Sequence, residues 1–190
     1  MLLTKKGLHL MRFQFTDTPE RYGSVSRFLH WSMALLLIWQ LATAVARILV
    51  KDSALDEFLW GTHRPVGALL MTLVLIRIAW ALTNRRQRPA AVSLMARLGH
   101  VGLYALLFFV PAFALLRQYG SGRAFSPFGI PLMPGFEGER IEWMLIPANL
   151  FHSWFGWLLF ALIAGHIVMV FVHRHRAGDT DVLPRMLGRR

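Results

Sequence analysis

The chain contains no cysteine among its 190 residues. This absence excludes disulfide bonds, iron–sulfur clusters held by thiolates, and haem attached through a Cys-x-x-Cys-His motif. Histidine is therefore the best metal or haem ligand that remains, and the sequence contains eight.

Acidic residues are scarce, with 10 Asp and Glu against 21 Lys and Arg. The acids cluster between the apolar stretches, and no set of nucleophile, base and orienting residue is present, so hydrolytic chemistry has no support. The bases are divided among several segments that border apolar stretches, rather than gathered in one patch. This distribution argues against a nucleic-acid partner.

Polar residues are too few for an ordinary soluble domain, because 55% of the chain is hydrophobic. The polar segment 1–27 is too long for the start of a cleavable signal peptide, and no small-residue cleavage motif follows the first apolar stretch. Met11 offers an alternative start. We predict an all-α integral membrane protein, a bundle of four helices that cross the bilayer at about residues 28–46, 65–82, 98–116 and 150–172.

The basic residues predict the orientation of the bundle. Fourteen Lys and Arg lie in segments 1–27, 83–97 and 173–190, against five in connections 47–62 and 117–147. Because a basic excess marks the cytoplasmic side, we expect a cytoplasmic N-terminal segment 1–27 and tail 173–190.

The connection 117–147 is then a periplasmic cap. It is rich in Gly and Pro but also holds aromatic anchors such as Phe125 and Phe128. A flexible linker would lack these anchors, so we expect a folded cap with a short helix near residues 139–144.

Five histidines lie in or at the edge of the apolar stretches. Ionisable groups inside a membrane are costly and usually face the bundle interior or a cofactor. A single such histidine is explained by an interhelical hydrogen bond, but five together indicate ligands. They are His30, His63, His100, His152 and His166.

His152 and His166 are fourteen residues apart in one stretch. At about 100° and 1.5 Å per residue, both imidazoles share one helix face and stand about 21 Å apart. One metal ion cannot bridge that distance, but two haems stacked across the membrane can each take one ligand from this helix.

Each haem needs a second ligand at matching depth. His63 suits His152, and His30 suits His166, but His100 lies near the same depth as His30. The spacing alone does not choose between His30 and His100. A haem held by two histidines has no vacant coordination site, so it transfers electrons rather than binding oxygen.

Three further residues fit this interpretation. Gly67 and Gly156 follow His63 and His152 by one turn, which lets a porphyrin edge approach the backbone, although small residues also help helices pack. Arg77, inside the second stretch, needs an anion such as a haem propionate, unless it reaches to the interface.

At these residues the sequence resembles the bacterial cytochrome b561 family, small four-helix membrane cytochromes with two b haems. The resemblance implies the ligand pairs His63 with His152 and His30 with His166. It places His100 close to the cytoplasmic-side haem and the chain in the bacterial inner membrane. It is carried by the segments TDTPERYGSVSRFLHW, GTHRPVGALLMTLVLIRIAW, ARLGHVGLYALLFFVP, GRAFSPFGIPLMP and FHSWFGWLLFALIAGH.

The resemblance implies two functions. One branch of the family, superoxide oxidase, takes electrons from superoxide and reduces ubiquinone, and a histidine seven residues after the last ligand lies near its quinone. The matching residue is His173, with Arg77 and Ser24 as further quinone-site candidates. On the donor side, the positive charges that would attract superoxide are Arg64, Arg117 and Arg123.

The alternative is a non-enzymatic cytochrome b subunit that serves a periplasmic redox protein. The last histidine pair is spaced as in the cytochrome b subunits of membrane formate dehydrogenases and hydrogenases, which operate with large periplasmic partners. Exposed aromatics of the cap would then form the docking surface. The sequence leaves the oligomeric state open.

Overall fold

The computed structural model describes residues 14–176 and 181–188, and the alternative start Met11 lies outside them. Within the described residues the regular structure is helical, apart from one isolated bridge between Phe125 and Met133. The helices are α1 (Ser24–Leu49), α2 (Ala54–Thr83), α3 (Leu94–Gly120), η1 (Pro127–Gly129), α4 (Glu142–Pro147), η2 (Ala148–His152), α5 (Ser153–His175) and α6 (Leu183–Leu187).

Four helical segments are long and apolar enough to cross a membrane: α1, α2, α3 and the stretch 142–175 formed by α4, η2 and α5. The prediction of an all-α membrane bundle of four helices is confirmed. Many large apolar side chains are exposed on these helices, as expected where lipid replaces water around them.

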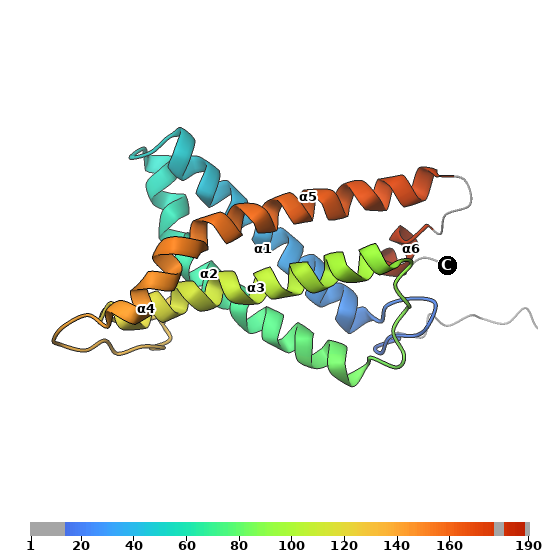
Figure 1. Ribbon diagram of the computed structural model, residues 1–190, viewed down its shortest axis with the longest axis horizontal. Coiled ribbons are helices and arrows are strands. Elements are labelled where there is room, and N and C mark those ends of the chain that lie inside the picture. The colour runs from blue at the N-terminus through green and yellow to red at the C-terminus, as the bar shows by residue number, and fades with distance from the viewer. Residues whose placement is uncertain (1–13, 177–180, 189–190) are drawn as a thin grey trace, which may run out of the picture.

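The helices alternate in direction, so their ends gather at two poles (Figure 1). At one pole α1 begins, α2 ends, α3 begins and α5 ends; we call this the terminal end. The other pole, the cap end, holds the α1–α2 connection and the loop 121–141. Helix α5 packs chiefly against α3, while α1 and α2 form the tightest pair.

The helices extend beyond the apolar stretches in the sequence. Helix α2 begins at Ala54 rather than near residue 65, because Ser53 caps it by accepting a hydrogen bond from the Asp56 N–H at 3.2 Å. His63 therefore lies well inside the helix. Helix α3 continues to Gly120, and the short cap helix is α4, three residues later than expected.

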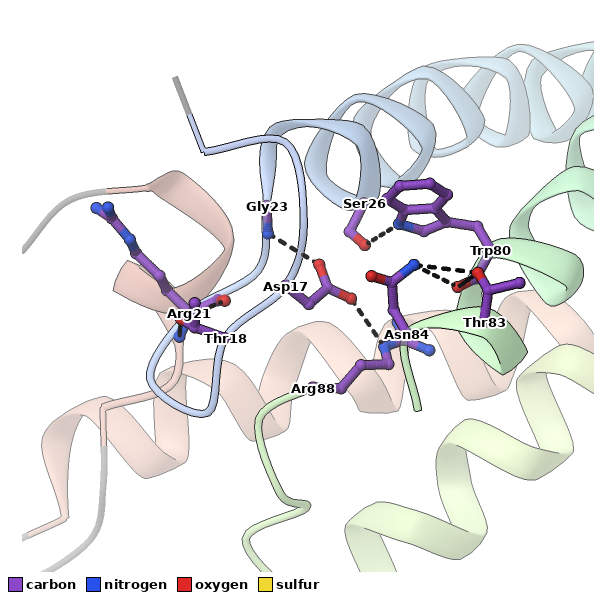
Figure 2. Close-up of polar contacts among 9 residues, drawn as sticks. All are labelled: Asp17, Thr18, Arg21, Gly23, Ser26, Trp80, Thr83, Asn84 and Arg88. Atoms are coloured by element: carbon purple, nitrogen blue, oxygen red, sulfur yellow. Dashed lines mark hydrogen bonds and ion pairs between the residues drawn. The ribbon is translucent and has the colours of Figure 1, made fainter. Parts of the chain in front are cut away.

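A buried polar cluster ties the elements together at the terminal end (Figure 2). Asp17 is fully buried, with Oδ2 3.2 Å from Arg88 Nε, and its Oδ1 accepts a hydrogen bond from the Gly23 N–H at 2.9 Å. Beside it, the Trp80 indole donates to Ser26 Oγ at 3.0 Å. The segment before α1 is thus fixed to the α2–α3 connection, and α1 to α2.

The tail also contributes to this end, through a helix that the sequence did not predict. Helix α6 lies against the first turns of α1, where the Arg27 guanidinium donates to the Leu187 carbonyl and the Trp31 indole to the Met186 carbonyl. Nearby, burial raises the pKa of Tyr22 above its ordinary value, and Arg88 opposes this effect. Tyr22 therefore remains a neutral phenol at physiological pH.

Candidate functional site

Two histidines face each other at the cap end, which we call the cap-end pair. His63 of α2 and His152 of η2 have ring centroids 6.2 Å apart, with the ring planes at 81°. Nδ1 of His63 lies 2.6 Å from Thr43 Oγ1, and Nδ1 of His152 lies 3.0 Å from the Val110 carbonyl oxygen. Each Nδ1 is thus engaged by another helix.

The contact with Val110 fixes the tautomer of His152. A backbone carbonyl only accepts hydrogen bonds, so Nδ1 must carry the proton and donate it. Nε2 then keeps its lone pair for a metal, the arrangement typical of histidine ligands. A π turn places His152 here, and such turns often occur at functional sites.

The cap-end pair opens onto a cavity of about 240 Å³. Gly67 and Gly156 both line it, as a cofactor edge near the backbone would require. A Cβ built on Gly156 would meet nothing within 4 Å, so this position opens directly into the space. A Cβ on Gly67 would lie 3.3 Å from Gln40 Nε2, so a side chain there would crowd the cavity wall.

Three histidines meet near the terminal end. The His166 ring centroid lies 6.4 Å from that of His30 and 5.4 Å from that of His100. Arg77 turns into the bundle, with Nη2 3.2 Å from His30 Nδ1 and its guanidinium 5.5 Å from the Tyr104 ring. We call His30 and His166 the terminal-end pair.

The spacing of both pairs suits an iron between them. A metal–nitrogen bond of about 2.0 Å and about 1.2 Å from nitrogen to ring centre, on each side, place the two centroids about 6.4 Å apart. The pairs at 6.2 and 6.4 Å match this value, whereas His100 at 5.4 Å from His166 is too close.

The number of facing histidines is compatible with haem. Across residues 14–176 and 181–188, no group of three or more His, Asp or Glu side chains is placed to hold a metal ion. Haem needs only two axial protein ligands, because the porphyrin supplies the other nitrogens. Two facing histidines therefore supply the number of protein ligands that a haem requires.

Comparisons with known proteins identify the family of this chain. A model of the prokaryotic cytochrome b561 family matches residues 21–189. Cytochrome b561 homolog 2 of Escherichia coli (strain K12) is 31% identical over 186 residues, which cover 92% of this chain and 95% of that protein. The chain belongs to the prokaryotic cytochrome b561 family. Membership implies electron transfer across a membrane, and the family resemblance found in the sequence is confirmed.

Within this cytochrome b561, the other predicted site residues divide between the two ends. Arg64 is exposed and lines the cap-end cavity beside His63, whereas Arg117 and Arg123, although exposed at the same end, are not among the lining residues. Ser24 opens α1 and His173 lies partly buried in the last turn of α5, so both belong to the terminal end.

The sequence did not indicate a stack of side chains behind His63. The Trp60 ring stacks on the His63 ring with centroids 4.7 Å apart, and the Arg47 guanidinium lies 4.5 Å above Trp60. Arg47 is in turn paired with the fully buried Asp56 at 3.0 Å. The Trp-x-x-His spacing within α2 was a local signal for the first contact, because residues three apart share a helix face.

Proposed function

We propose that this cytochrome b561 carries electrons across the bacterial inner membrane through two b haems, each held by one histidine pair. His63 and His152 would bind the outer haem at the cap end, and His30 and His166 the inner haem at the terminal end. The observation that carries the proposal is the presence of two imidazole pairs, at opposite ends of one bundle, each at the spacing of paired axial ligands. When bound, haem b would supply a one-electron iron couple.

The surrounding residues have matching roles. Gly67 and Gly156 leave room for a porphyrin edge, and Arg77 offers a guanidinium to an inner-haem propionate. His100 lies beside His166 without ligand spacing, so we assign it to the surroundings of the inner haem. Single replacements test these assignments: His63→Ala should remove the outer haem, His30→Ala the inner haem, and His100→Ala neither. Loss of the inner haem from His100→Ala but not from His30→Ala would reverse the assignment.

The orientation follows from the charges on the helix ends. Exposed bases gather at the terminal end, and the bases of the cap end are interspersed with acids such as Asp52 and Glu57. By the positive-inside rule, the terminal end is cytoplasmic and the cap is periplasmic. Among the residues that the structure describes, the exposed bases of the terminal end are Arg85, Arg86, Arg97, Arg174 and Arg176.

For the reaction, we propose superoxide:ubiquinone oxidoreductase. Each of two superoxide anions loses one electron and becomes dioxygen, and the two electrons with two cytoplasmic protons convert ubiquinone to ubiquinol. Arg64 supplies an exposed positive charge at the cavity that holds the cap-end pair, where a small anion would approach. The quinone would bind at the terminal end near His173, Arg77 and Ser24.

Stopped-flow mixing of the oxidised protein with superoxide tests this reaction. Haem reduction should approach the diffusion limit and slow as salt rises, because attraction between charges is screened. Arg64→Gln should slow this phase, and Arg140→Gln, which removes an exposed cap charge away from the cavity, should not. Adding a soluble ubiquinone should reoxidise the reduced protein, more slowly in His173→Ala. Absence of haem reduction by superoxide would contradict the enzymatic reaction.

The cap supports a second candidate, an electron-transfer subunit for a periplasmic redox protein. Phe128 and Ile130 of the loop 121–141 are each 65% exposed, and Trp143 of α4 is 64% exposed. Exposed aromatics are typical of protein interfaces. Slow, salt-insensitive reduction by superoxide, together with recovery of a periplasmic redox protein from native membranes, would favour this function over the enzyme.

A further inference from the structure

The second ring nitrogen of His63 contacts a hydroxyl that is itself fixed. Thr43 of α1 is fully buried, and its Oγ1 lies 2.6 Å from His63 Nδ1 and 2.8 Å from the carbonyl oxygen of Gln40. The Gln40 amide Nε2 donates to the His63 carbonyl oxygen at 3.1 Å. Two side chains of α1, one turn apart, therefore hold the segment of α2 that carries this histidine.

Counting protons decides the direction of the short contact. A hydroxyl has one hydrogen, and the Gln40 carbonyl can only accept, so the Thr43 O–H donates to Gln40. The Oγ1 lone pairs then face His63, and Nδ1–H donates to them. This tautomer leaves Nε2 unprotonated, as iron binding requires. If Thr43 instead donated to Nδ1, the proton would sit on Nε2 and block the ligand.

The terminal-end pair has the opposite environment. His30 Nδ1 faces Arg77 Nη2 at 3.2 Å, and a guanidinium has donors but no acceptor. The guanidinium can therefore only donate at this contact, and its positive charge lies beside the ring. For His30 Nε2 to bind iron, Nδ1 must carry the ring proton, so Arg77 would have to turn from Nδ1 toward the haem propionate proposed above. The electrostatic surroundings of the two pairs are therefore opposite. The Nδ1–H groups of the cap-end pair donate hydrogen bonds to two oxygen acceptors, while His30 faces a cation.

We propose that Thr43 is a positioning residue that fixes the His63 tautomer and makes the outer haem harder to reduce than the inner haem. Donation from Nδ1–H increases the electron density on the imidazole, which stabilises ferric iron. A nearby guanidinium destabilises the more positive ferric state instead. The resulting difference in reduction potential between the two haems favours electron flow from the cap end to the terminal end. This inference rests on the two-haem assignment proposed above.

The test is a spectroelectrochemical titration of the purified protein with both haems bound. Thr43→Val keeps the shape of the side chain and removes the acceptor. At a fixed potential it should raise the ferrous-to-ferric ratio of the outer haem about tenfold, a shift of about 59 mV for one electron. Thr43→Ser should restore the wild-type value. The midpoint potential of the inner haem should stay unchanged in both variants.

Thr62→Val is the matched control. Thr62 precedes His63, but its hydroxyl bonds to the Leu59 carbonyl and the Trp39 indole rather than to the imidazole. The Thr62→Val variant should leave the midpoint potentials of both haems unchanged. Arg77→Gln identifies which component of the titration belongs to the inner haem. It should lower the midpoint potential of the inner haem and leave that of the outer haem unchanged.

An unshifted outer midpoint in Thr43→Val, or a shift equal to that of Thr62→Val, would overturn the inference. If Thr43→Val does not retain the outer haem, Thr43→Cys takes its place, since a thiol is a weaker acceptor and should give a smaller shift in the same direction. No shift in Thr43→Cys would then overturn the inference. A wild-type titration with only one haem component would instead contradict the two-haem assignment.

Discussion

Each histidine of the cap-end pair has one ring nitrogen held by a neighbouring helix. The Val110 carbonyl and the Thr43 hydroxyl set which nitrogen carries the proton, so the free nitrogens can both turn toward one centre. Trp60 stacks on the face of His63 and limits rotation of its ring. At the scale of single residues, these contacts orient both imidazoles in the way that the proposed haem ligation requires.

Gly156→Leu should remove the outer haem and leave the inner haem in place. The new side chain would project into the cavity between His63 and His152, where a Cβ meets nothing within 4 Å. Haem content per chain and the amplitude of the reduced-minus-oxidised spectrum measure the loss. Gly61→Leu adds the same side chain at an open position outside the cavity, so it should retain both haems. Equal haem content in the two variants would contradict the role of Gly156.

Site roles for these histidines and glycines could be predicted from the sequence because the signals are local. A histidine in an apolar stretch is conspicuous, and helical spacing shows which ones share a face. Thr43 and Gln40 gave no such signal, since hydroxyl and amide residues are ordinary in membrane helices. Their roles depend on the alignment of α1 with α2, which no spacing within one helix reveals.

At the scale of elements, helix ends determine how the cap and the termini are held. Gly120 ends α3 where α4 crosses it closely. A Cβ at this position would lie 2.6 Å from Met144 Cβ and 3.1 Å from the Ile141 carbonyl oxygen. The cap can therefore lie against α3 only because this residue has no side chain.

Gly120→Ala should thus destabilise the cap by about 1–3 kcal/mol, the usual cost of an overpacked contact. Thermal unfolding in detergent should occur at a lower temperature, and proteases should cut the loop 121–141 faster. Gly61→Ala, at an open helical position, controls for the change in helix propensity, which favours alanine by about 1 kcal/mol. The close packing would be refuted by a Gly120→Ala protein as stable as Gly61→Ala.

The stability of the terminal end depends on the buried carboxylate of Asp17, which pairs with Arg88. Asp17→Asn would leave Arg88 beside a neutral partner in a mostly buried site, and we expect a loss of about 2–3 kcal/mol, reduced because the Arg88 side chain is 21% exposed. The double change Asp17→Asn with Arg88→Gln should regain part of this loss. Glu20→Gln, an exposed acid in the same segment, should have no measurable effect on thermal unfolding. A loss no larger than that of Glu20→Gln would show that the pair does not stabilise the fold.

Hydropathy predicted the four long apolar helices but not the residues at which they begin and end. The polar first turns of α2 are set by the Ser53 cap, which a search for apolar stretches passes over. Helix α6 is five residues long and depends on contacts with α1, far away in the sequence. Its own residues are too few to form an isolated helix in water.

The whole molecule has two unlike ends joined by four helices. The cap end combines an engaged histidine pair, a cavity and a mixture of charges, while the terminal end combines three histidines, Arg77 and an excess of exposed bases. The 31% identity to cytochrome b561 homolog 2 of Escherichia coli extends over both ends. Histidines at both ends of the bundle suit a family that transfers electrons across a membrane.

The number of haems per chain tests the central claim most directly. The purified protein, assayed as the pyridine haemochrome against its protein concentration, should contain two b haems per chain, and the untreated protein should show a low-spin spectrum. That result would agree with two histidine pairs that each fill both axial positions. One haem per chain, or a high-spin spectrum, would contradict the account.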